Sequence, residues 1–127
     1  MENKEILNKI IEGAKQTEQV TIQWNGEDFH FTLKPLTAGE LSTIQKIERK
    51  GLSININQKG ANPVPINAGD LADAQNEAMY KGISYSLDAP VDQIRQLPIS
   101  IVEALFKEII RISNITDKEL VLIKNFQ

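Results

Sequence analysis

The sequence predicts an α+β fold in which an N-terminal β-hairpin packs against a mainly α-helical domain of four to five helices. Two runs of alternating apolar and polar residues flank Asn25-Gly26, and this is a strong hairpin signal because both residues tolerate positive φ. The segments around the hairpin repeat apolar residues at helical spacing instead. The 127 residues fit a single domain, residues 1–127, with a buried core.

The first segment, residues 1–17, contains the pattern of a short amphipathic helix over residues 3–15. Charged and amide side chains occupy the rest of the helix surface. A helix of this kind packs either on its own domain or on a partner. Its apolar stripe consists of Ile6, Leu7, Ile10, Ile11 and Ala14.

The predicted hairpin spans residues 18–36. Parity restricts its register, since a slip of one residue turns the apolar side chains of a strand to the other face. A two-residue loop sets Ile22 opposite Phe29, and a four-residue loop sets Ile22 opposite Phe31. Both registers keep the apolar faces together. An isolated hairpin is only marginally stable in water, so we expect helices to cover its apolar face, which comprises Val20, Ile22, Trp24, Phe29, Phe31 and Leu33.

A helix is predicted over residues 37–50. Thr37 is the expected N-cap, and Glu40 stands at the spacing of a capping box. Gly51 is well placed as a C-cap. The narrow inner stripe of this helix consists of Leu41, Ile44 and Ile47.

Residues 51–69 are rich in Gly, Asn and Pro and predict a flexible excursion. Ile54 and Ile56 alternate with polar residues, which gives the segment some strand character. A second hairpin about Lys59-Gly60 and a long mobile loop both remain open, because loops of this length inside a domain are usually functional or disordered.

The segment 70–127 is predicted to be the helical half of the domain. Asp70 is the expected cap of a helix that ends near Leu87, and residues 91–96 predict a short helical turn. Pro98 opens a long helix, where its missing N–H costs nothing. A wide apolar arc marks that helix as the central one.

The central helix is expected to end at Ser113-Asn114. Thr116, with Glu119 at capping-box spacing, then predicts a last helix. We expect this helix to continue through Leu120, Val121 and Ile123.

Catalytic chemistry finds no support in the sequence. There are no cysteines and one histidine, His30, which faces away from the apolar side of its strand, so a zinc site is very improbable. The acidic pairs have structural interpretations as a hairpin tip, first helical turns and caps. Neither a Gly-rich phosphate loop nor a nucleophile elbow occurs. We therefore expect a protein that is not an enzyme, with no catalytic residue, cofactor or metal.

Charge and hydropathy narrow the class of partner. The net charge is −3 and the basic residues are spread along the chain, whereas a nucleic-acid interface needs clustered Lys and Arg. No apolar run approaches the roughly 20 residues of a membrane helix, and the acidic N-terminus is unlike a signal peptide. The expectation is a cytoplasmic protein that binds neither nucleic acid nor membrane.

The order of these elements resembles that of the tail assembly chaperones of long-tailed phages and related proviruses, over roughly residues 18–115. Members of that family commonly carry a strand-borne F-x-L/V-K-x-L-T-x-x-E motif, matched here by Phe31, Leu33, Lys34, Leu36, Thr37 and Glu40. A later helix commonly reads L-P-x-x-[IV]-x-x-[LI], matched here by Leu97, Pro98, Ile101 and Ala104-Leu105.

This resemblance implies a non-enzymatic protein that binds the long, helical tape-measure protein and presents it for tail assembly. An apolar groove is a standard way to hold a helical segment. The partner-binding residues expected on this basis are Trp24, Phe29, Phe31, Leu33, Ile99, Val102 and Phe106. Alternative functions are a structural tail or baseplate subunit of a virion and a small transcriptional regulator. Homo-oligomerisation also stays open.

Overall fold

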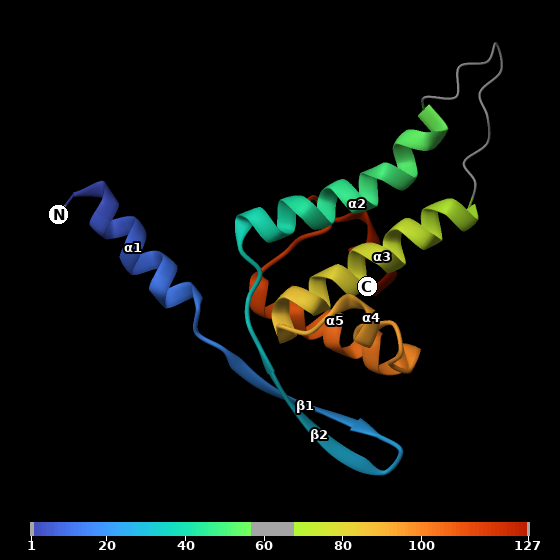
Figure 1. The fold of residues 1–127 in the computed structure, drawn as a ribbon, viewed down its shortest axis with the longest axis horizontal. Helices are drawn as coiled ribbons and strands as arrows, with labels where there is room; N and C mark the ends of the chain where they lie inside the picture. The colour runs from blue at the N-terminus through green and yellow to red at the C-terminus, as the bar shows by residue number, and fades with distance from the viewer. Residues whose placement is uncertain (1, 57–67, 127) are drawn as a thin grey trace.

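The computed structural model of the chain describes residues 2–56 and 68–126, with the side chains of residues 2–50 and 72–123. It has the predicted α+β architecture, a two-stranded antiparallel hairpin against a helical body (Figure 1). In chain order its elements are α1 (Asn3–Ala14), β1 (Glu18–Trp24), β2 (Glu27–Leu33), α2 (Ala38–Ile56), α3 (Ala68–Leu87), α4 (Val91–Ile94), α5 (Ile99–Ser113) and the 3₁₀ helix η1 (Val121–Phe126).

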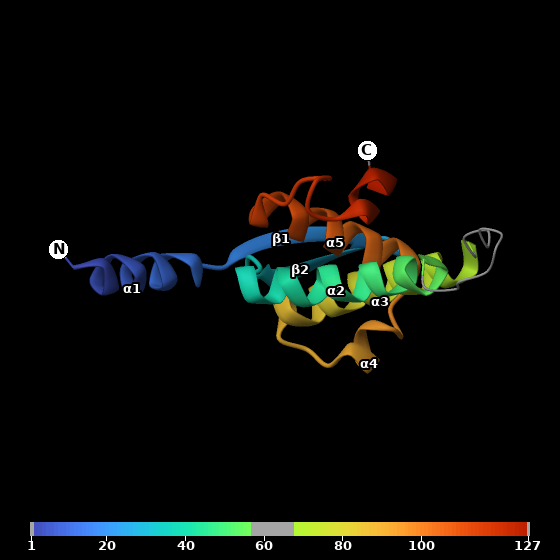
Figure 2. The same cartoon turned by 90° about the horizontal axis from the view of Figure 1, so that it is seen from above.

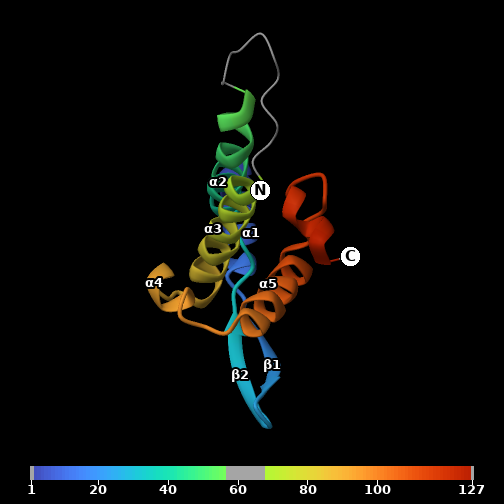
Figure 3. The same cartoon turned by 90° about the vertical axis from the view of Figure 1, so that its right-hand side faces the viewer.

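The helical body is built around the antiparallel pair α2 and α3, which lie side by side (Figures 1 and 2). Helix α5 packs on both α3 and β1, so it connects the helix pair to the hairpin. The short α4 and the C-terminal η1 lie on opposite sides of the α2–α3 pair (Figures 2 and 3). The hairpin tip extends beyond the helices (Figures 1 and 3).

The hairpin has the two-residue loop that turn chemistry favours. Ile22 pairs with Phe29 and Trp24 with Glu27. Asn25 and Gly26 both have positive φ, +55° and +77°, as a type I′ turn requires. This backbone twist matches that of the flanking strands, so the turn itself sets the register.

Helix α2 begins as predicted but ends later. The Glu40 carboxylate accepts a hydrogen bond from the N–H of Thr37 (3.0 Å), and the Thr37 hydroxyl accepts one from the N–H of Glu40 (3.2 Å). Gly51 is not a C-cap, because the helix continues through it to Ile56. The predicted strand character at Ile54 and Ile56 is therefore also wrong.

Tertiary packing explains this extension. A glycine inside a helix costs only about 1 kcal/mol relative to alanine, and helices in proteins draw most of their stability from packing. Helix α2 packs along α3, so the glycine does not end it. The alternatives of a hairpin about Lys59-Gly60 and a mobile loop lie outside the described residues over 57–67.

Helix α3 begins at Ala68, so Asp70 is not its cap. Asp70 is instead the third residue of the helix. The helix ends before Asp88, which adopts a left-handed φ of +55°. The predicted short turn of helix follows as α4.

Helix α5 is the central helix that the sequence predicts. Pro98 stands at its N-cap position, and Asn114 ends it in the left-handed conformation, a common helix stop. The core lies where α2, α3, α5 and the hairpin meet. Its largest fully buried side chains include Leu33, Ile44, Ile83, Leu105, Phe106 and Ile109.

The C-terminal segment differs from the predicted α-helix. Glu119 does accept hydrogen bonds from the N–H and hydroxyl of Thr116, at 3.3 and 3.1 Å. The chain nevertheless turns there, and a 3₁₀ helix follows from Val121. Leu120 and Leu122 are buried, so contacts with the body decide the path of this segment.

Candidate partner-binding site

An apolar groove opens between the hairpin tip and the start of α5. Its volume is about 190 Å³. We call it the aromatic groove, and its lining residues are Trp24, Phe29, Phe31, Leu97, Pro98 and Ile101. Two segments that are far apart in the sequence therefore build one surface.

The hairpin fixes the aromatic wall of the groove. Trp24 is the last residue of β1 and pairs with Glu27, so its ring lies diagonally across from Phe29. The two ring centroids are 6.5 Å apart at an interplanar angle of 52°, a favourable tilted geometry for aromatic pairs. The type I′ turn between them leaves little freedom in their spacing.

The α4–α5 connection supplies the opposite wall. The N–H of Leu97 donates to the carbonyl of Ile94 (3.1 Å), and the N–H of Ile101 donates to the carbonyl of Pro98 (3.0 Å). Both bonds hold Leu97 and Pro98 in a fixed backbone turn. These two bonds fix the backbone of the wall that faces the hairpin.

An ion-pair network ties the end of α4 to α3. Arg95 donates to Glu77 of α3 at 2.6 Å and to Asp92 at 2.9 Å. The hydrogen bond with Glu77 is the main reason that the pKa of Arg95 is raised, and Asp92 adds to it. The α4–α5 connection is thus held against the helical body by charge as well as by packing.

Exposure shows which groove residues a partner can touch. Trp24 is 42% and Phe29 37% exposed, whereas Ile101 is buried. The aromatic rings therefore form the rim and Ile101 belongs to the floor. A cavity of about 150 Å³ accepts a benzene-sized group, so the groove has room for one large apolar side chain.

The predicted partner-binding residues fall into separate groups. Trp24, Phe29 and Phe31 line the groove. Ile99 is 59% exposed, next to Pro98 in the chain. The other predicted residues are 0–1% exposed in the core, where a partner has no access to them; these are Leu33, Val102 and Phe106.

Sequence reasoning missed Leu97, Pro98 and Ile101 as groove residues. The Leu97-Pro98 pair predicts the start of a helix and, with Ile101, matches the second family motif, but none of the three residues is among the predicted partner-binding residues. Ile101 lies on the same apolar arc as the core residues of α5. The available signal was the match of all three residues to that motif.

The opposite face of the hairpin is polar. The Thr21 hydroxyl and the Nδ1 atom of His30 are 2.9 Å apart and hydrogen-bonded on the exposed surface. His30 therefore lies away from the groove, as predicted. Within residues 2–56 and 68–126, no group of three or more His, Cys, Asp or Glu side chains is arranged to hold a metal ion.

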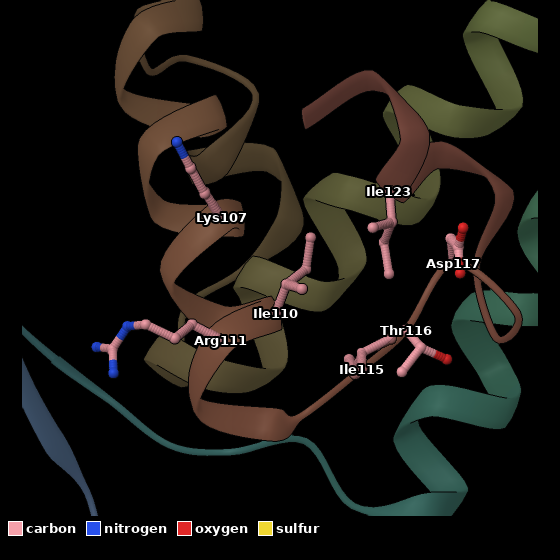
Figure 4. Close-up of a pocket in the computed structure, with 7 residues that line it drawn as sticks. All are labelled: Lys107, Ile110, Arg111, Ile115, Thr116, Asp117 and Ile123. Carbon is pink, nitrogen blue, oxygen red and sulfur yellow. The ribbon is translucent and has the colours of Figure 1, made fainter. Parts of the chain in front are cut away.

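A second, larger cavity of about 460 Å³ lies between α5 and the C-terminal segment (Figure 4). Ile110, Ile115 and Ile123 approach one another across it, whereas Lys107 and Arg111 extend away from it. The Arg111 guanidinium is paired with Glu18 and Glu108. The remaining lining residues of this cavity are Thr116 and Asp117.

Comparison of the chain with protein-family models, curated proteins and solved structures finds no match. Among the helices in the described part of the chain, none has both the length and the apolar character that crossing a membrane would require.

Proposed function

We propose that this protein is a non-enzymatic tail assembly chaperone of a phage or provirus, which holds a helical segment of a long tape-measure protein in the host cytoplasm. One observation carries the proposal. The two motifs that resemble the chaperone family meet at the aromatic groove, because Phe31 comes from the first motif and Leu97, Pro98 and Ile101 come from the second.

The shape and chemistry of the groove support this function. Its rim consists of two partly exposed aromatic rings on a rigid hairpin. Exposed aromatic anchors of this kind dominate protein interfaces. An amphipathic helix docks through apolar side chains three or four residues apart, and the groove accepts one such side chain while Ile99 offers an adjoining apolar contact.

The proposal is tested by co-expression of this chain with the tape-measure protein of the same phage or provirus. The chaperone should keep that protein soluble and should co-purify with it. Trp24→Ser should abolish both effects, because it removes the larger ring of the rim. A matched control is Val121→Ser, since Val121 is 44% exposed but lies outside the groove.

Two outcomes oppose the proposal. Unchanged solubility of the long protein in the presence of the chain contradicts a chaperone role. Recovery of the chain in purified particles at fixed stoichiometry indicates a structural tail subunit instead, because an assembly chaperone should be absent from the finished virion.

A further inference from the structure

Helix α1 carries an apolar stripe that the rest of the described chain leaves uncovered. Every described residue of α1 is exposed. An isolated helix of 12 residues is marginal in water, so a second surface is needed to stabilise it. The stripe contains four large aliphatic side chains that are 41–62% exposed, Ile6, Leu7, Ile10 and Ile11.

The attachment of α1 gives it the form of an arm. It leaves the body at the start of β1 through the exposed residues 15–17 and projects away from the hairpin (Figures 1 and 2). A helix of this length spans about 18 Å, and the connection adds up to about 10 Å. The arm is therefore long enough to reach across to a neighbouring molecule.

We propose that α1 of one copy docks its stripe into the aromatic groove of a second copy, and that the exchange is reciprocal. The chemistry of the two surfaces matches, since aliphatic side chains at helical spacing meet an apolar groove, which is the usual helix-in-groove arrangement. Ile10 is the most exposed member of the stripe, so it is the anchor that enters the groove, and Leu7, which is nearly as exposed, contacts the rim beside it.

Buried area favours this occupant over a simple pairing of two α1 helices. Burying one Leu or Ile removes roughly 60–120 Å² from water, so two stripes alone supply roughly 500–1,000 Å². Specific interfaces bury about 1,200–2,000 Å². Adding the exposed parts of Trp24, Phe29 and Ile99 from two grooves brings the total to roughly 1,100–1,600 Å². Reciprocal exchange therefore reaches the size that a stable dimer needs.

If the protein has the proposed chaperone function, the exchange also regulates access to the groove. The arm of a second copy and the helix of a client protein compete for one surface. The free protein is then a dimer with protected grooves, and client binding releases the arms. A chaperone built in this way does not expose its aromatic rim before its client is present.

Size-exclusion chromatography with light scattering measures the molar mass of the full chain in solution and so tests the proposal. The wild type should have twice the 14.2 kDa monomer mass. Leu7→Glu/Ile10→Glu should halve that mass. Lys9→Glu lowers the net charge by the same two units on the polar face of α1 and should leave the dimer intact.

A groove variant and a mixing experiment identify the docking surface. Trp24→Lys should also give a monomer, whereas Gln23→Lys on the neighbouring exposed position should not. Mixing the two monomeric variants should give a dimer only at a higher protein concentration than the wild type needs, because one intact arm meets one intact groove and the reciprocal contact is lost. Recovery on mixing also shows that both variants are folded.

A wild type that is monomeric throughout a concentration series overturns the exchange. A dimer that persists in Trp24→Lys points to pairing between α1 helices and overturns the docking surface. Two variants that stay monomeric when mixed at every concentration also overturn the docking surface. A wild type that is monomeric and still keeps the client soluble contradicts the arm exchange but not the chaperone function. A wild type that is dimeric and does not keep the client soluble contradicts the chaperone function but not the arm exchange.

Discussion

The carboxylate of Glu48 in α2 accepts a hydrogen bond from the backbone N–H of Val121, with Oε1 and N 2.8 Å apart across 73 residues of sequence. Its other oxygen accepts the N–H of Leu122, also at 2.8 Å. Gln45, one turn earlier, donates from Nε2 to the carbonyl of Glu119 at 3.0 Å. The side chain of Glu48 is buried, so α2 provides an internal cap for the start of η1.

Removing this cap should destabilise the protein. In Glu48→Ala the N–H groups of Val121 and Leu122 lose a charged acceptor, and hydrogen bonds to charged groups contribute about 1.5–3 kcal/mol each. Because such contributions are not additive, we expect the free energy of unfolding to fall by about 2–4 kcal/mol. Urea denaturation measures this change.

Glu103→Ala is the matched control for the Glu48 variant. Glu103 is an exposed glutamate on α5, and substitutions at such positions usually stay within about 0.5 kcal/mol of the wild type. An effect of the same size in both variants contradicts the role assigned to the Glu48 carboxylate. Faster hydrogen exchange at Val121 and Leu122 in Glu48→Ala would locate the damage at η1.

Gly82 marks the closest approach of α3 to its neighbours. A Cβ atom there would lie 2.9 Å from Cε1 of Phe106 and 3.2 Å from Cδ1 of Ile44. Overpacking a core costs about 1–3 kcal/mol, whereas alanine gains about 1 kcal/mol of helix propensity. Gly82→Ala should therefore lower the stability by up to about 2 kcal/mol in chemical denaturation.

A second glycine separates the two effects. At Gly39, in the first turn of α2, nothing lies within 4 Å of the position that a Cβ would take. Gly39→Ala should therefore be neutral or stabilising by up to about 1 kcal/mol. Equal stabilisation by Gly82→Ala and Gly39→Ala would contradict close packing at Gly82.

The hairpin turn couples backbone conformation to the groove. Gly26 has a φ of +77°, and a side chain in the left-handed region costs about 1–2 kcal/mol. Gly26→Val should lower stability by about that amount and should also weaken client binding, because the turn sets the position of Trp24. Asn25→Gly keeps a residue that tolerates positive φ and should retain both properties. Circular dichroism melts and the co-purification assay measure the two effects.

Arg111 connects α5 to the first strand through Glu18. The hydrogen bond with Glu18 is the largest cause of the raised pKa of Arg111, followed by the bond with Glu108. A raised folded-state pKa gives a contribution that is fully present below the ordinary arginine pKa and is lost only at higher pH. The stability difference between wild type and Arg111→Gln should thus be the same at pH 7 and pH 9. Urea denaturation at both pH values measures this difference. A stability difference that is present at pH 7 and absent at pH 9 would contradict the prediction.

Short-range signals predicted several features correctly. The Asn25-Gly26 turn, the Thr37 capping box and the Asn114 stop all depend on residues within a few positions of one another. Their geometry is therefore contained in local sequence. The amphipathic pattern of α1 is local in the same sense.

Long-range contacts explain where the predictions failed. The helix passes through Gly51 because α2 packs along α3, and the C-terminal segment forms a 3₁₀ helix that starts at the Glu48 carboxylate. A glutamate four residues after Ile44, on the buried side of α2, was the one signal of this contact. Its partner could not be read from the sequence.

Turns, caps and helical periodicity act over a few residues, so the local sequence specifies the hairpin, its faces and the positions where most helices begin. Which apolar residues a partner can reach depends instead on tertiary packing. Phe29 and Leu33 share one face of β2, yet one forms the rim of a groove and the other is fully buried. That difference depends on where α5 crosses the hairpin, which is set by packing between segments some 70 residues apart.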